Sequence, residues 1–301
     1  MRMFRLVALA ALPLLVMAAV GMAPRDDVPD VLFFPGANSR ETWFSVHNLR
    51  AAHELARGAG VKVGIMDHSF GLDALGELYA GGENFQTGGW GAAYRTEAHH
   101  GSWMARALKE VAPDVEVYAL GTYDGDETSR VRAMAQALEW AVAHDLDAVT
   151  YSAGAFSPEA REALDPAVEN AVANGVTVIF IHYPHPLNLF TSGIGPRSGD
   201  DEREPDLNIF HYDYSVVFTE RYAALMRGDD ASGYRPFLSL SSTAPVAAGM
   251  VALMKSLDPT LTPADCRRIL QEASGSFTFQ GRTGARVPDA RRALEIVRGS
   301  T

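Results

Sequence analysis

Cysteine is almost missing from this sequence. Its 301 residues contain a single cysteine, Cys266, so the chain cannot form an internal disulfide. Cys266 lies in a segment predicted to be helical, where a buried and unreactive thiol is the usual case. The fold must therefore be held by its hydrophobic core, and a hydrophobic content of 47% allows a substantial one.

Positive charge is also scarce. Lysine and arginine together number 26 against 37 aspartates and glutamates, which gives a formal net charge of −11. A chain with this balance has no broad basic surface for nucleic acid or for an anionic membrane. The sequence also lacks the glycine fingerprint of dinucleotide-binding proteins and the phosphate-binding loop. We therefore expect no nucleic-acid partner.

The longest apolar run lies at the N-terminus. Arg2 and Arg5 precede a nearly unbroken apolar run over residues 6–20, and small residues follow up to Ala23. This order predicts a signal peptide over residues 1–23, and therefore a secreted or periplasmic protein. An uncleaved membrane anchor is the alternative, because the run is close to the shortest that spans a bilayer. We expect an N-terminal extension over 24–48 and one main domain over 49–301.

Strands and helices alternate along the chain. Strands are predicted over 31–34, 61–66, 115–120, 148–152 and 176–181, and helices over 49–57, 103–111, 127–144, 166–174, 246–254, from 262 onward and over 289–297. Residues 70–94 and the acidic stretch 193–206 are expected to be surface loops, with a calcium site at Asp200–Glu204 as the alternative for the second. The alternation predicts an α/β fold of three layers, in which helices cover both faces of a mostly parallel sheet.

One stretch carries the strongest functional signal. Residues 239–255 place a cluster of hydroxyl residues and Pro245 immediately before an apolar run. Proline is tolerated in the first turn of a helix, where backbone N–H groups have no partner within the helix. Ser241 and Ser242 therefore stand at the start of a helix that is apolar on every face and predicted to be buried. Such a serine either caps the helix or lies beside amide groups able to bind an oxyanion.

An aspartate and a histidine occupy comparable positions. Asp67 follows the predicted strand 61–66, at the carboxyl end where sites are built in open α/β sheets. His100 precedes the predicted helix 103–111. The three residues thus lie at the ends of elements in the order aspartate, histidine, serine, which is the chain order of subtilisins.

The local sequences resemble those of the subtilisin-like serine peptidases (subtilases, peptidase family S8). The strand that ends in Asp67-His68-Ser69 resembles the family's Asp-Ser/Thr-Gly strand, and residues 100–105, His-Gly-Ser-Trp-Met-Ala, resemble its His-Gly-Thr-His-Val-Ala motif. Residues 239–249 resemble Gly-Thr-Ser-Met-Ala-Ser-Pro-His-Val-Ala-Gly, and this alignment registers Ser241 with the nucleophile. The likeness covers roughly residues 49–297 and predicts a divergent member with the family's three-layer fold.

The resemblance implies a catalytic set of Asp67, His100 and Ser241. Ser241 would attack the scissile carbonyl, His100 would take the proton of the hydroxyl, and Asp67 would hold the imidazole in the correct tautomer. The implied activity is that of a serine endopeptidase that forms an acyl-enzyme, and no cofactor is called for. Its partners would be peptide or protein substrates.

A substrate-binding strand is implied as well. Residues 147–154 resemble the strand along which the family binds its substrate. Ser152, Ala153 and Gly154 would pair backbone to backbone with an extended peptide. Their small side chains would leave room for a substrate side chain.

The chain departs from the family after the predicted strand 176–181. Subtilases have Gly-Asn there, and the asparagine donates a hydrogen bond to the oxyanion, but this chain has Pro184 in its place. Proline has no donor, so we consider His185 and His182 as substitutes and prefer His185, because strand alternation would turn His182 to the other face. Both histidines are equally well explained as structural or surface residues. The loss of one oxyanion donor costs on the order of 10²–10³ in turnover.

Two other functions stay open at this point. A catalytically inactive, subtilase-like peptide-binding or scaffold protein is favoured by the missing Gly-Asn and by the lack of a segment of propeptide size between the signal peptide and the main domain. A metal-dependent hydrolase would use His99, His100, His182 and His185. No helical His-Glu-x-x-His motif accompanies those histidines.

Overall fold

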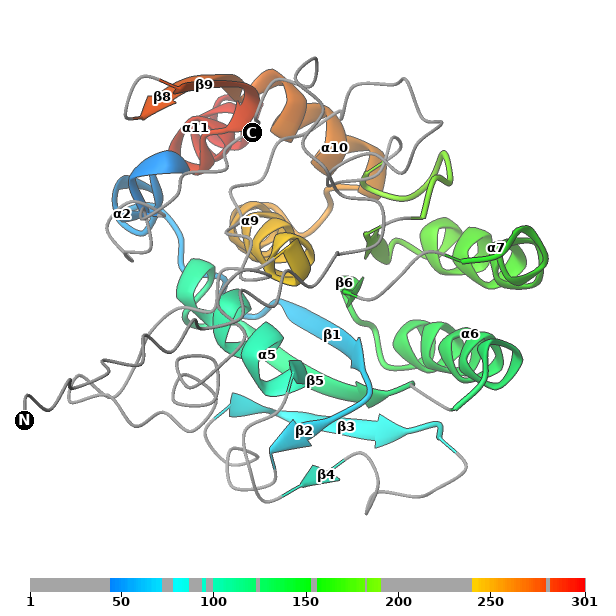
Figure 1. The fold of residues 1–301 in the computed structure, drawn as a ribbon. Helices are drawn as coiled ribbons and strands as arrows, with labels where there is room; N and C mark the ends of the chain where they lie inside the picture. The colour runs from blue at the N-terminus through cyan, green and yellow to red at the C-terminus, as the bar shows by residue number, and fades with distance from the viewer. Residues whose placement is uncertain are drawn as a thin grey trace, which may run out of the picture.

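The computed structural model describes most of the chain (Figure 1). The described residues are 44–71, 78–86, 94–95, 100–122, 125–152, 156–181, 183–190, 240–279 and 282–300. The predicted signal peptide, the predicted strand 31–34 and the acidic stretch 193–206 lie outside these ranges. Within them, no helix is both long enough and apolar enough to cross a membrane.

A sheet of parallel strands forms the centre of the described structure. Its order is β3-β5-β1-β6-β7, where β3 is Gly81–Asn84, β5 is Glu116–Gly121, β1 is Lys62–Asp67, β6 is Ala148–Tyr151 and β7 is Thr177–Phe180. Each neighbouring pair is parallel. The strands β1, β6 and β7 are almost wholly buried. Such burial is typical of apolar strands that are covered on both faces. The carboxyl end of β1 lies between β5 and β6, in the middle of the sheet.

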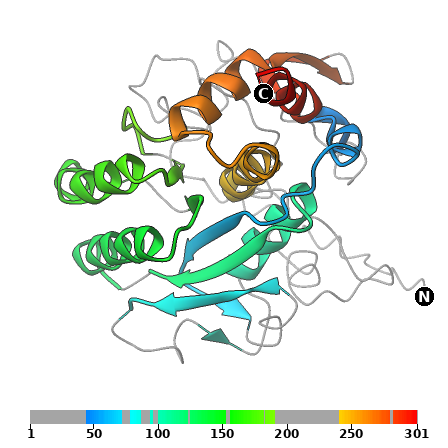
Figure 2. The same ribbon diagram turned by 180° about the vertical axis from the view of Figure 1, so that it is seen from behind.

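Helices cover both faces of this sheet (Figures 1 and 2). On one face, α6 (Glu127–Ala143) and α7 (Pro158–Ala173) form an apolar cluster with the strands. On the other, α5 (His100–Val111) and α9 (Thr243–Leu257) form a second cluster, which also contains residues of α10 (Pro263–Glu272) and α11 (Ala290–Ser300). This arrangement confirms the predicted three-layer α/β fold.

The helix α9 is the most deeply buried of these helices. Every residue from Thr243 to Lys255 is buried, as its apolar sequence predicts, and Pro245 lies in the first turn. The helix packs closely on α5 at Gly249, where an added Cβ would lie 2.5 Å from Cβ of Val111. This close contact between two helices fixes the start of α9 relative to α5.

The expected surface loop over residues 70–94 is wrong in part. It contains β3, an edge strand of the central sheet, and a short parallel pair of β2 (Phe70–Gly71) with β4 (Tyr94–Arg95). The sequence Gly-Gly-Glu-Asn of β3 has no strand signature. Glycine is needed there because a Cβ at Gly82 would clash with the carbonyl oxygen of Ala119 on β5.

Two further elements differ from the expectation. The helix expected to begin at Pro166 begins at Pro158, because the hydroxyl oxygen of Ser157 caps it by accepting a hydrogen bond from the Ala160 N–H at 3.1 Å. Pro166 lies inside the helix and is exposed. A hairpin of β8 (Ser274–Phe279) and β9 (Arg282–Pro288) was not expected at all.

The helix α10 begins as predicted. Thr262 and Asp265 form a capping box, in which each side chain accepts a hydrogen bond from the other residue's backbone, and Pro263 lies in the first turn. Cys266 is buried within this helix, and burial raises the pKa of its thiol to about 12. The predicted burial of the thiol is therefore confirmed, and a raised pKa disfavours the reactive thiolate.

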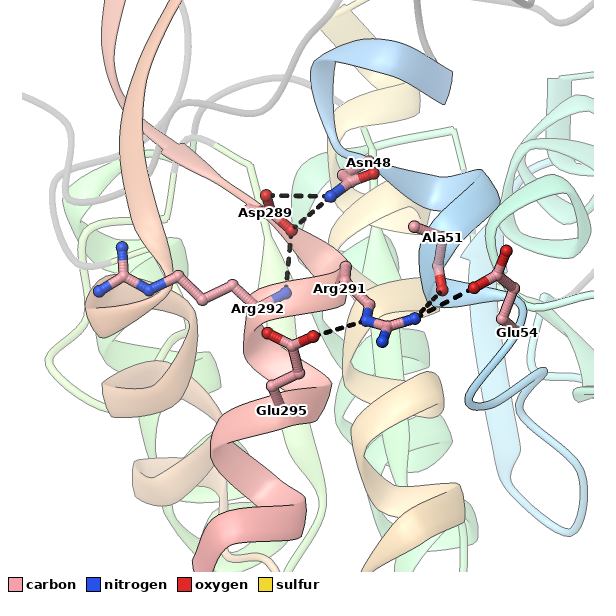
Figure 3. A network of polar contacts seen from close by, with 7 residues as sticks. All are labelled: Asn48, Ala51, Glu54, Asp289, Arg291, Arg292 and Glu295. Carbon is pink, nitrogen blue, oxygen red and sulfur yellow. Dashed lines mark hydrogen bonds and ion pairs between the residues drawn. The ribbon is translucent and has the colours of Figure 1, made fainter.

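The helix that follows Asn48 is bound to the last helix (Figure 3). The guanidinium of Arg291 on α11 donates to the Ala51 carbonyl of α2 (Leu49–Ala52) at 3.0 Å and approaches Glu54 at 3.3 Å. Asn48 donates to the carboxylate of Asp289 at 3.3 Å. Buried residues extend back to Phe44, so the packed body includes residues before the expected start of the main domain at residue 49. The helix expected over 49–57 ends at Ala52.

Candidate active site

The structure brings Asp67 and His100 together. Asp67 is the last residue of β1 and His100 is the first of α5. Nδ1 of His100 lies 2.6 Å from Oδ2 of Asp67, a hydrogen bond in which the imidazole N–H donates to the carboxylate. The Asp67 side chain is 3% exposed and that of His100 is 20% exposed. The pair is therefore shielded from water, while the histidine keeps some access to solvent.

A glycine allows this contact. The Gly101 N–H donates to the Ser69 carbonyl at 2.8 Å, and this bond joins the start of α5 to the chain that leaves β1. An added Cβ at Gly101 would lie 2.5 Å from Cε1 of Phe70. Any larger residue would thus push the first turn of α5 away from β1, and His100 with it.

Each member of the pair shifts the pKa of the other. Burial alone would raise the pKa of Asp67, but the charge and the hydrogen bond of His100, with a smaller contribution from His68, lower it well below its usual value. Burial alone would lower the pKa of His100, but the negative charge of Asp67 and the hydrogen bond raise it above 6.5. Asp67 is therefore a carboxylate at neutral pH, and it favours a proton on His100.

The nucleophile expected from the sequence lies in a turn that packs against the helix of His100. Ser241 is in η2 (Leu240–Ser242), the turn that leads into α9, and η2 packs against α5. Ser241 is partly exposed, whereas Ser242 is completely buried. Ser241 and His100 are both described, and no hydrogen bond joins them. Such bonds are often long in the absence of substrate. Of the two serines, only Ser241 is open to an incoming substrate.

The expected substrate-binding strand is described only in part. Ser152 follows β6 directly and is 5% exposed. Its hydroxyl has no hydrogen-bond partner in the described part of the chain. Ala153 and Gly154 lie outside the described residues, so their pairing with a peptide stays a prediction.

The structure places His185 on the side of the sheet that α7 covers. The ring stacks on Tyr183 with centroids 5.7 Å apart, and Nε2 lies 3.9 Å from a carboxylate oxygen of Glu169 on α7. Its Nδ1 accepts a hydrogen bond from the Leu187 N–H at 3.2 Å. These contacts do not favour His185 as an oxyanion donor, and His182 lies outside the described residues. The role of both histidines stays a prediction.

An asparagine follows β7 after all, but its side chain has another task. Asn188 is completely buried. Its Oδ1 accepts from the Phe180 N–H at 2.9 Å, and its Nδ2 donates to the carbonyls of Phe180 and Tyr183, each at 2.8 Å. The amide thus closes the turn after β7. Asn188 was not expected from the sequence, where a lone asparagine in an apolar stretch was the available signal.

The ring of His68 is a second partner of Asp67 that the motif comparison did not anticipate. Its Nδ1 lies 2.9 Å from Oδ1 of Asp67. Asp67, His68 and His100 each offer a metal-ligand atom, and these atoms lie within 4.8 Å of one another. The hydrogen bond of His100 and the contact of His68 with the carboxylate account for this spacing, so the arrangement does not require a metal. His99 and His182 of the alternative metal site lie outside the described residues.

Known proteins resemble this chain in sequence and in fold. Subtilisin DY from Bacillus licheniformis is 30% identical over 237 residues, which are 72% of this chain and 85% of that protein. Fervidolysin from Fervidobacterium pennivorans, a keratinolytic enzyme related to subtilisin, has a similar structure with a TM-score of 0.55 and 16% identity, over 89% of this chain and 49% of that one. MycP1 from Mycobacterium smegmatis has a TM-score of 0.52 and 16% identity, over 84% and 83% of the two chains.

No family model matches the chain. The two solved structures support the fold alone. The sequence similarity to subtilisin DY also supports membership of a family. Because the identity to subtilisin DY is 30% over 72% of this chain and 85% of subtilisin DY, the chain belongs to the subtilisin-like serine protease family.

Proposed function

We propose that this protein is a serine endopeptidase that hydrolyses peptide bonds through Ser241, His100 and Asp67. The observation that supports this most is the 2.6 Å hydrogen bond between Nδ1 of His100 and Oδ2 of Asp67. A proton held on Nδ1 by the carboxylate leaves Nε2 as the atom that accepts a proton from a serine hydroxyl. Ser241 is the partly exposed serine beside the same helix.

The reaction follows from this pairing. His100 takes the hydroxyl proton as the Ser241 oxygen attacks the peptide carbonyl, and the imidazolium that forms is stabilised by Asp67. His100 then gives the proton to the leaving amine, and an acyl-enzyme remains. Water attacks this ester with His100 again as the base. Because Asp67 raises the pKa of His100 above 6.5, the free base that the attack needs is abundant only on the alkaline side of that value.

The oxyanion would be held by the start of α9. The first backbone N–H groups of a helix have no partner within it, and the dipole of a buried helix adds positive potential there. A second donor is proposed from the segment after β7. His182 is the better candidate of the two histidines, since His185 contacts α7. Asn188 would have to give up its bonds to Phe180 and Tyr183 to serve.

The substrate would be an extended peptide that pairs with Ser152, Ala153 and Gly154. The small side chains of these residues support this role. The N-terminal run over residues 6–20 supports export through a signal peptide, with an anchored protein as the alternative. The site of action would then be secreted or periplasmic.

Peptide hydrolysis by the purified protein tests this function. We expect cleavage of casein and of fluorogenic peptides by the wild type, and no measurable cleavage by the Ser241→Ala variant. Ser242→Ala is the matched control, since the neighbouring hydroxyl is buried, and it should retain most of the activity. Equal activity in Ser241→Ala and wild type would contradict the assignment of the nucleophile.

A catalytically inactive peptide-binding protein is the second candidate. In the ungapped alignment Pro184 stands where the family has its oxyanion asparagine, and His185 contacts Glu169 of α7 and Tyr183. This candidate would bind peptides with the same affinity in the wild type and in Ser241→Ala, without cleavage in either. Fluorescence polarisation with labelled peptides would reveal that behaviour.

A further inference from the structure

An open groove lies between the end of β3 and the second half of α6. The residues that line it come from these two elements and are 83–86, Gln136, Glu139, Trp140 and Ala143. Its volume is about 570 Å³, which is within the ~300–1,000 Å³ typical of ligand sites. The groove lies on the face of the sheet that α6 and α7 cover, whereas α5 and α9 lie on the other face. It is therefore separate from the candidate active site.

Two carboxylates line the groove without a cation of their own. Oε1 of Glu83 accepts a hydrogen bond from the Asn84 N–H at 3.0 Å, and Glu139 is exposed. Neither carboxylate has an ion pair within the described part of the chain. No lysine or arginine lines the groove, and Lys62 instead donates to the His144 carbonyl at 3.2 Å. The groove therefore favours a positively charged ligand.

Aromatic rings lie beside these carboxylates. Phe85 and Trp140 are both half-buried and pack against the apolar cluster between α6 and the sheet. The ring of His144 stacks on Trp140 with centroids 3.7 Å apart, and the ring of Tyr118 lies 5.9 Å from it. Lysine and arginine have an apolar stem and a charged end, and aromatic rings attract cations. Fixed aromatic rings next to unpaired carboxylates therefore suit a basic side chain, whereas a neutral oligosaccharide would make no use of the negative charge.

The groove ends close to Asp67. Asn84 pairs with Gly121 of β5, and Gly121 pairs with Asp67 of β1, so these three residues lie in one row across the sheet. Neighbouring strands are ~4.8 Å apart, which places the backbone of Asn84 roughly 10 Å from that of Asp67. Nε2 of Gln86 donates to the His68 carbonyl at 3.4 Å. A polypeptide in the groove therefore leads to the edge of the sheet at which Asp67 lies.

We propose that this groove is a second binding site for the substrate, which takes a lysine or arginine side chain of a polypeptide at a distance from the bond that is cleaved. The carboxylates of Glu83 and Glu139 bind the positive end, and Phe85 and Trp140 contact the apolar stem. This inference rests on the proposed peptidase function. Such a site strengthens the binding of polypeptides with basic segments and leaves the chemical step unchanged.

Binding to the Ser241→Ala protein tests the groove without cleavage. We expect fluorescently labelled oligolysine to bind, and the binding to weaken as salt is added. In the same protein with Glu83→Gln and Glu139→Gln, Kd should increase by about tenfold. Glutamine keeps an oxygen that can accept the Asn84 N–H bond, so β3 should stay in place. Glu159→Gln is the matched control, because Glu159 is an exposed carboxylate on α7 that does not line the groove, and it should leave Kd unchanged.

NMR locates the ligand. The indole N–H signal of Trp140, assigned by its loss in Trp140→Phe, should shift when oligolysine is added, and oligoglutamate should leave it in place. A shift with a cello-oligosaccharide but not with oligolysine would overturn the assignment to a basic side chain. An equal Kd for oligolysine with and without the two glutamine substitutions would overturn it as well.

Kinetics test the link to the reaction. A fluorogenic peptide extended by an oligolysine segment should show a KM about tenfold higher in Glu83→Gln/Glu139→Gln than in the wild type, with an equal kcat. The same peptide without the segment should show equal KM values in the two proteins. Equal changes of KM for both peptides would contradict the recognition of a basic segment by the groove.

The binding and kinetic measurements separate the failure of this inference from the failure of the proposed function. An active peptidase whose affinity for oligolysine does not depend on Glu83 and Glu139 would overturn the groove and retain the proposed function. A protein that binds oligolysine in the groove but cleaves no peptide would retain the groove as a binding site and contradict the peptidase proposal.

Discussion

Two carboxylates lie at opposite ends of the same sheet, and each is paired with a base from a helix. At the carboxyl end of β1, Asp67 binds His100 of α5 at 2.6 Å. At the opposite end, Asp147 precedes β6 and binds Nζ of Lys255, near the end of α9, at 3.1 Å. The Lys255 side chain is only 6% exposed and that of Asp147 is 23% exposed. The helix α9 therefore carries Ser241 before its first residue and an ion pair near its last.

The carboxylate of Asp147 joins the beginnings of the strands. The carboxylate accepts a hydrogen bond from the Lys62 N–H at 2.9 Å. The backbone carbonyl of Asp147 accepts another from the Thr177 N–H at 2.9 Å. Lys255 also donates to the Gly175 carbonyl at 3.4 Å. The cation thus ties the end of α9 to the first residues of β1, β6 and β7.

The difference between the two pairs lies in the base. Histidine is the only side chain whose charge ordinarily changes between pH 5 and 8, so Asp67 has a partner that can exchange a proton during a reaction. The pair of Asp147 and Lys255 instead holds the strands and α9 together. A carboxylate at an end of this sheet therefore supports chemistry or structure according to the base beside it.

Removal of His100 should give the largest effect. We expect His100→Ala to lower kcat/KM by about 10⁴–10⁶-fold, the order known for serine peptidases that lose their general base. The protein should remain folded, because the change leaves Asp67 bonded to His68. Peptide hydrolysis and circular dichroism measure the two properties. A loss smaller than tenfold in folded protein would contradict the role of His100.

Removal of Lys255 should act on stability instead. We expect Lys255→Met to lower the free energy of unfolding by about 3 kcal/mol, because it leaves the Asp147 carboxylate without its cation. Activity per folded molecule should stay within about twofold of wild type. Denaturant titration checks the first result, and a double variant with Asp147→Asn should recover part of the loss. A large fall in activity without a fall in stability would erase the contrast between the two pairs.

A change at Gly249 should affect both properties. An added methyl would meet Val111, so we expect Gly249→Ala to cost about 1–3 kcal/mol of stability and to move η2 relative to His100. A misplacement of about 1 Å costs on the order of 10² in turnover. Gly299→Ala in α11 is the matched control, since a Cβ there meets nothing within 4 Å. Equal behaviour of the two variants would show that the contact does not position Ser241.

The pH dependence should be the smallest effect. Because Asp67 raises the pKa of His100 above 6.5, the pair stabilises the fold fully below that pH, and this contribution is lost as pH rises through the raised pKa. The lowered pKa of Asp67 means that its contribution is present above 3.8 and is lost as pH falls through the lowered value. Asp67→Asn should therefore lower the free energy of unfolding by more at pH 5 than at pH 8.5. The activity of the wild type, in contrast, should increase from pH 5 to pH 8.5. Equal costs at both pH values would contradict the coupling.

Much of the fold could be predicted from periodicity. The runs that became β1, β5, β6 and β7 are apolar and short, and α9 is apolar on every face, so these elements follow directly from burial. β3 could not be found in this way. It is an edge strand. At Gly82 the backbone approaches β5 so closely that no side chain fits, so the residue type there is not set by the packing of apolar side chains. The start of α7 was missed because Pro166 looks like a first-turn proline although it lies inside the helix.

The part of the candidate site that lies in sequence motifs could be predicted. Asp67 and His100 were expected from the ends of their elements, and the structure joins them by a hydrogen bond. The preference for His185 rested on strand alternation past residue 180. β7 ends at Phe180, however, and Asn188 closes a turn there. The contact of His68 with Asp67 depends on a rotamer, which spacing in the sequence cannot give.

The central claim is that His100, held by Asp67, activates Ser241. The most direct test is the rate at which a fluorophosphonate labels the protein as a function of pH, with the labelled residue identified by mass spectrometry. We expect a label on Ser241, a rate that increases as His100 loses its proton above pH 6.5, and no labelling in His100→Ala. Absence of labelling in folded wild-type protein, or a label on another residue, would contradict the central claim.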